Sequence, residues 1–133
     1  MKKKRIIAIC FTFMMLFTAV SAVLAATNRM TWEGQGIIGK RSIQTMKLGS
    51  KTTVTVYNNI TKASGVPNKC DATLSLQKQG WFGTWSTSYE MSQKSLGSSS
   101  WKVTLDSGTY SVWFNSNKIN GVTNPLDMKG YIR

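Results

Sequence analysis

WKVTLDSGTYSVWFN, residues 101–115, decides the fold class of this 133-residue chain. Apolar side chains occupy every second position on both sides of a short polar turn: Trp101, Val103 and Leu105, then Tyr110, Val112 and Phe114. Successive side chains of a β-strand point to opposite faces, so this period of two predicts two strands, each with one buried face. The turn Asp106-Ser107-Gly108 has the length of a hairpin connection.

The same alternation extends outward from this segment through most of the chain. It recurs at residues 52–57, 70–77 and 85–91, continues to a last strand with Met128 and Ile132, and suggests one or two strands between Ile37 and Leu48. Turn residues separate the segments at Gly80–Gly83, Leu96–Ser100 and Asn120-Gly121. We therefore predict an all-β fold, a small antiparallel β-sandwich of about six to eight strands, with a small closed barrel as the alternative.

The alternation also assigns individual side chains to faces. It places Trp85 and Trp101 toward the core, and it places Trp113 on the face opposite Tyr110 and Phe114. Cys70 begins an apolar face and is expected to pack as a small buried hydrophobe.

The N-terminus has the pattern of a secretory signal peptide. Four basic residues at positions 2–5 precede an apolar run from Ile6 to Leu24 that ends in small residues. We predict that residues 1–25 are a signal peptide and residues 26–133 a single β-sandwich domain that is secreted. An uncleaved membrane anchor is the alternative, because about 19 apolar residues can span a bilayer.

The predicted mature domain is strongly basic. Removal of residues 1–25 leaves 13 Lys and Arg against five Asp and Glu, a net charge of +8. Positive charge draws a protein to polyanions. For an exported domain these are anionic lipid, wall polymers and lipid-linked wall precursors, and export argues against nucleic acid. The alternative is that the cations only keep the protein soluble.

The residue inventory argues against an enzyme. The chain has no histidine, and Cys70 is the single cysteine after position 25, so Ser–His, Cys–His and zinc sites cannot be assembled. A pair of carboxylates remains formally possible, but the spacing of Glu33 and Glu90 does not bring them together. We therefore expect no catalytic activity, no metal and no cofactor.

Aromatic residues supply the strongest candidate site. Trp81 and Phe82 lie between Gly80 and Gly83, where no strand face buries them, and Lys78 is close by. Exposed loop aromatics next to cations enter membrane interfaces or stack on sugar rings. The alternative is that the loop folds back and caps the end of the sandwich. The envelope-binding candidates are Lys78, Trp81, Phe82 and Trp113.

Part of the chain resembles the lactococcin 972 family. The resemblance rests on Thr31-Trp32 with Gly34 and Gly36, and on Gly49-Ser50-Lys51-Thr52 followed by Val54, Val56 and Asn58-Asn59. It implies an exported bacteriocin with a small β-sandwich fold that binds the lipid-linked precursor of the cell wall and blocks septum formation. After Asn59 the chain departs from the family pattern, and no binding residues are transferred.

Two functions are compatible with the sequence. The first is a secreted antimicrobial, bacteriocin-like protein that acts on the envelope of competing bacteria by binding wall precursor or membrane surface. The second is a non-toxic binding or structural module of the producer's own surface or matrix. Charge and aromatic residues fit both.

Overall fold

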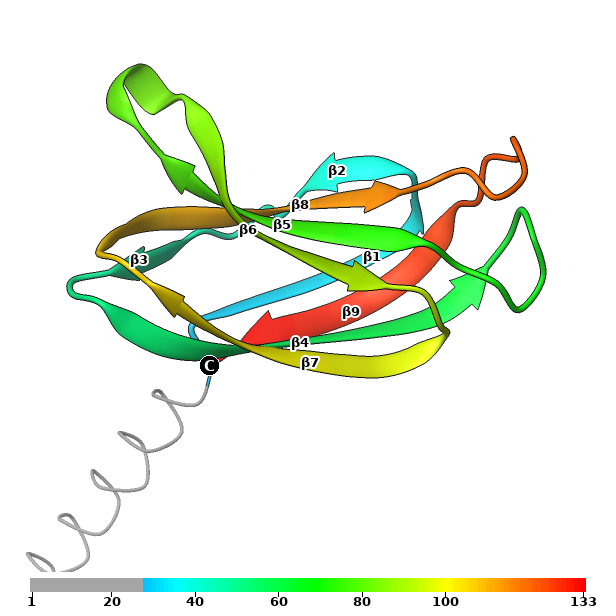
Figure 1. The fold of residues 1–133 in the computed structure, drawn as a ribbon, viewed down its shortest axis with the longest axis horizontal. Coiled ribbons are helices and arrows are strands. Elements are labelled where there is room, and N and C mark those ends of the chain that lie inside the picture. The colour runs from blue at the N-terminus through cyan, green and yellow to red at the C-terminus, as the bar shows by residue number, and fades with distance from the viewer. Residues whose placement is uncertain (1–27) are drawn as a thin grey trace, which may run out of the picture.

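Nine antiparallel strands form two facing sheets in the computed structural model, which describes residues 28–133 (Figure 1). The predicted signal peptide lies outside the described residues. The strands are β1 (Met30–Ile37), β2 (Gly39–Arg41), β3 (Met46–Leu48), β4 (Thr52–Ala63), β5 (Ala72–Gln79), β6 (Trp85–Gln93), β7 (Gly97–Leu105), β8 (Gly108–Ser116) and β9 (Leu126–Ile132). Within residues 28–133, no helix is long and apolar enough to cross a membrane.

The strand order confirms the predicted β-sandwich. One sheet has the order β1-β9-β4-β7, and the other has the order β2-β8-β5-β6 with β3 also paired to β8. The apolar faces of the two sheets meet in one core that includes Val56, Leu74, Val112 and Leu126, all with no exposed surface. The strand count exceeds the expected six to eight because residues 30–48 form three strands, β1, β2 and β3, where the sequence suggested one or two after Ile37.

The connection at Asp106-Ser107-Gly108 is not a hairpin, so that expectation is wrong. β7 pairs with β4 in one sheet, whereas β8 pairs with β5, β2 and β3 in the other. The turn therefore crosses from sheet to sheet, and the apolar faces of β7 and β8 line the shared core from opposite sheets. In the described part of the chain, β5 and β6 are the only consecutive strands that pair directly.

A β-bulge in β6 overturns the expectation that Trp85 faces the core. Leu76 pairs with Tyr89 but Gln77 pairs with Thr87, so Ser88 has no residue opposite it. The extra residue exchanges the two faces of the strand beyond it. Trp85 consequently lies on the outer face of the sheet, while Trp101 packs partly buried against the core as expected.

A buried chain of polar side chains joins the two sheets. The Trp32 indole N–H of β1 donates to Asn58 Oδ1 of β4 at 2.9 Å, and Asn58 Nδ2 donates to Gln93 Oε1 of β6 at 3.0 Å. Gln93 Nε2 in turn donates to the backbone carbonyls of Ser95 and Gly97 in the β6–β7 loop. This network fixes how one sheet sits over the other.

Candidate functional site

The β5–β6 hairpin projects from the sandwich and carries the predicted aromatic loop at its tip (Figure 1). The Gly80 N–H donates to the Thr84 carbonyl at 2.7 Å, and the Thr84 hydroxyl donates to the Trp81 carbonyl at 2.9 Å. Between them Trp81–Gly83 form one 3₁₀ turn, in which Phe82 has a left-handed backbone with φ of 60°. The tip is therefore a closed loop held by its own backbone and by Thr84.

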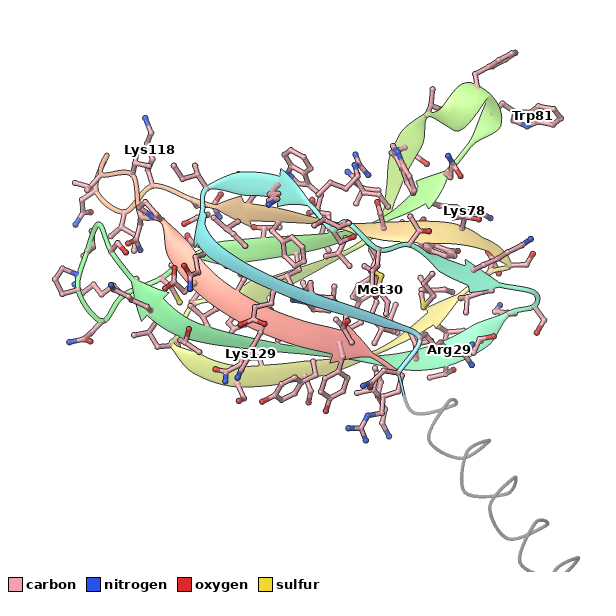
Figure 2. The ribbon with its side chains drawn as sticks, turned by 180° about the vertical axis from the view of Figure 1, so that it is seen from behind. Arg29, Met30, Lys78, Trp81, Lys118 and Lys129 are labelled. Carbon is pink, nitrogen blue, oxygen red and sulfur yellow. The ribbon has the colours of Figure 1, made fainter. Side chains whose placement is uncertain are left out.

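Both tip rings lie in solvent. Trp81 is 88% exposed and Phe82 is fully exposed. Figure 2 shows Trp81 pointing away from the body of the molecule. The alternative in which the loop caps the end of the sandwich is wrong, because the paired strands project away from the body of the sandwich and both rings are exposed (Figure 1). Since exposed aromatic residues are the kind that membranes and sugars contact, the tip remains the leading candidate site.

Lys78 lies at the foot of the same hairpin. Lys78 pairs with Tyr110 and is the last residue of β5 on the inward-facing side of the strand. Its aliphatic side chain covers Gly108, where an added Cβ would lie only 2.5 Å from Lys78 Cε. The side chain is half-buried. Lys78 thus lies on the same side of the molecule as Trp81, as Figure 2 shows.

Trp113 is not part of the hairpin tip. It lies on the outer face of the five-stranded sheet, 36% exposed, with the Arg41 guanidinium 5.7 Å from its ring centre. The same guanidinium lies 4.6 Å from the Trp85 ring, and Arg41 Nη1 donates to the Ser111 hydroxyl at 2.7 Å. The structure therefore joins Trp113 to Arg41 and Trp85, which sequence reasoning did not associate with it.

The sequence offered no signal for this second cluster. Arg41 lies on a three-residue strand, and Trp85 reaches it only because of the bulge at Ser88. Cation–π contacts of this kind stabilise a surface by about 0.5–1 kcal/mol at exposed sites. Because Arg41 already occupies the ring faces, the cluster is better suited to covering the sheet than to receiving a ligand.

A cleft of about 330 Å³ opens where the edge strands β1 and β2 separate. Trp32, Ile37 and Phe114 supply its apolar lining, and Glu33 and Lys40 bring charges of both signs to it. The alternation pattern predicts which residues face inward, but it does not show where two sheet edges separate.

Two groups have altered acidity. Burial, and to a smaller extent the charge of Asp71, raises the pKa of the Cys70 thiol. Burial and Asp106 likewise raise the pKa of Tyr110, whose hydroxyl donates to the Asp106 carbonyl at 2.8 Å. Both groups face the core and not the hairpin tip. In residues 28–133 there is no group of three Cys, Asp or Glu side chains placed to hold a metal ion.

The chain was compared with family models, curated proteins and solved structures. No family model matches the chain, and no curated protein matches it. Among solved structures, the chain is similar to the Yersinia pseudotuberculosis-derived mitogen, with 16% sequence identity and a TM-score of 0.38. That similarity covers 77% of this chain and 83% of the mitogen.

Proposed function

We propose that this chain is a secreted, cationic, non-enzymatic protein of the antimicrobial, bacteriocin-like class that acts at the bacterial envelope. The observation that carries the proposal is the pair of solvent-exposed rings, Trp81 and Phe82, on a hairpin that projects from a basic domain. A soluble domain gains no stability from such rings, so their exposure is best explained by a partner that covers them.

Three features of the sequence support the same function. The N-terminus has the pattern of an export signal, the predicted mature domain has a net charge of +8, and its front third resembles exported bacteriocins. An anionic envelope component is the partner that this charge favours: lipid-linked wall precursor, wall polymer or anionic lipid.

A growth assay with a matched pair of variants tests the proposal. Wild-type protein is expected to inhibit related bacteria, and Trp81→Ala/Phe82→Ala is expected to lose most of that inhibition and most of its binding to whole cells. The control is Ile43→Ala/Val122→Ala, which truncates two other exposed apolar residues, 91% and 46% exposed, and should remain active. Normal growth of all tested bacteria with cell binding retained would favour the surface-module alternative.

A further inference from the structure

The hairpin tip is convex, and this shape distinguishes the possible partners. Trp81 and Phe82 are consecutive residues at the end of a projecting loop, and neither is buried against another side chain. The loop's own hydroxyl, on Thr84, is already bonded to the Trp81 carbonyl. A sugar site needs polar groups converging on the ligand beside the stacking ring. A fluid bilayer does not require converging polar groups, because its lipids rearrange around an inserted side chain.

The backbone at the tip holds the rings outward. Phe82 adopts φ of 60°, a conformation that costs a residue with a Cβ free energy, directly before Gly83 at φ of 74°. Strain of this kind at an exposed position is typical of a functional loop. Aromatic side chains are also the ones enriched where water meets the hydrocarbon of a membrane.

Three lysines lie near the foot of the hairpin. Lys78 of β5 pairs with Tyr110 of β8, and on the other side of β8 Lys47 of β3 pairs with Thr109. Lys51 follows in the β3–β4 turn at the same end of the sandwich, and both Lys47 and Lys51 are exposed. We call Lys47, Lys51 and Lys78 the basic collar.

The two ends of the sandwich carry similar charges but differ in exposed aromatic residues. Lys69, Lys94 and Lys118 lie at the opposite end with Asp71, whose carboxylate accepts a hydrogen bond from Asn117, and the hairpin end has Asp106 in the β7–β8 turn beside the basic collar. Figure 2 shows Lys118 at the far end of the molecule from Trp81. Among residues 28–133, the exposed rings of Trp81 and Phe82 therefore distinguish the hairpin end from the opposite end.

We propose that this end docks on an anionic lipid bilayer, with Trp81 and Phe82 inserted at the interface and the basic collar against lipid phosphates. The inference rests on the proposed envelope function and names the partner of the same site. Insertion of apolar side chains and attraction to anionic headgroups both favour binding at the interface. Each basic residue near the membrane surface adds to the binding free energy.

Vesicle binding tests the rings. The purified protein should bind vesicles of phosphatidylglycerol and phosphatidylcholine and bind pure phosphatidylcholine vesicles far more weakly. Trp81→Ala/Phe82→Ala should reduce binding to the anionic vesicles on the order of 100-fold. Ile43→Ala/Val122→Ala should leave it unchanged, and every protein compared carries the same N-terminus. Equal binding by the two double variants would overturn the inference.

Two variants of equal net charge test the collar. Lys47→Gln/Lys51→Gln should weaken binding to the anionic vesicles about tenfold or more, whereas Lys94→Gln/Lys118→Gln at the far end should weaken it much less. High salt should reduce this difference, because the screening length falls to about 3 Å at 1 M. Equal losses in the two variants would show that net charge alone attracts the protein, without the docked orientation.

Fluorescence and isolated cell walls separate this inference from the proposed function. On vesicles the emission of wild type should shift to shorter wavelength, and Trp81→Phe should lose that shift because Trp81 is the tryptophan that inserts. A protein that inhibits bacteria and binds isolated walls but not anionic vesicles would contradict bilayer docking and leave the envelope function standing. Vesicle binding without inhibition of bacteria would support bilayer docking and contradict the proposed antimicrobial function.

Discussion

Cys70 is buried at the edge of the core, and its thiol lies 3.9 Å from the Gln93 carbonyl. Because burial raises the pKa of the thiol, the folded state retains its proton at a pH where the unfolded chain loses it. The contribution of this thiol to the free energy of unfolding is fully present below the pKa of the unfolded thiol, about 8.5, and it decreases as pH rises above that value. We therefore expect the free energy of unfolding to decrease from about pH 8.5 upward.

Denaturant unfolding of wild type and Cys70→Ala between pH 7 and pH 10 measures this effect. The alanine variant should be less stable at pH 7, and the difference between the two proteins should narrow as pH rises. Tyr110, whose pKa is also raised, contributes a further loss near and above pH 10 in both proteins, so it cancels in the comparison. A constant difference across this range would show that the thiol does not titrate differently in the two states.

Single residues show where prediction from sequence succeeds and where it fails. Trp81 and Phe82 could be singled out because flanking glycines interrupt the alternation, although the sequence left open whether the loop is exposed or caps the sandwich. Trp85 could not be assigned to its face, because the bulge at Ser88 depends on how β6 pairs with β5. The Arg41 contact that follows from this bulge joins strands far apart in the sequence and has no local signal.

At the scale of the element, the hairpin tip has one strained residue. Phe82 lies in the left-handed region, which costs a residue with a Cβ about 1–2 kcal/mol, while glycine adopts it freely. Its ring is fully exposed and contributes no core packing. Phe82→Gly should therefore be more stable than Phe82→Ala by about 1 kcal/mol, measured by denaturant unfolding. A more stable alanine variant would indicate that the tip has a different backbone in solution.

The turns between strands show that the sequence pattern also fails to predict which strands pair. Gly80–Gly83 and Asp106–Gly108 are both short turns between alternating segments, yet only the first joins paired strands. Alternation identifies the buried face of a strand but not its neighbour. β7 and β8 bury their apolar faces in the shared core from opposite sheets, an arrangement that has the same sequence pattern as a hairpin.

For the whole molecule, the relation between the sheets depends on polar groups as well as apolar packing. Asn58 follows Val54 and Val56 on the inward face of β4 and has no exposed surface. Its amide accepts from Trp32 and donates to Gln93, so it lies at the centre of the network that joins the sheets. The period of two places Asn58 inside, but its two partners come from strands 26 and 35 residues away and depend on the final packing.

Removal of the Asn58 side chain should leave two buried groups without partners, the Trp32 indole N–H and Gln93 Oε1. Each such group costs about 1–3 kcal/mol, so Asn58→Ala should lower the free energy of unfolding by roughly 2–4 kcal/mol. The matched control is Asn59→Ala on the same strand, where the side chain is half-exposed and the change should stay within about 0.5 kcal/mol. Equal stability of the two variants would mean that water or relaxed neighbours satisfy the network. Because Trp81 and Phe82 lie outside this network, Asn58→Ala molecules that remain folded should bind anionic vesicles as wild type does.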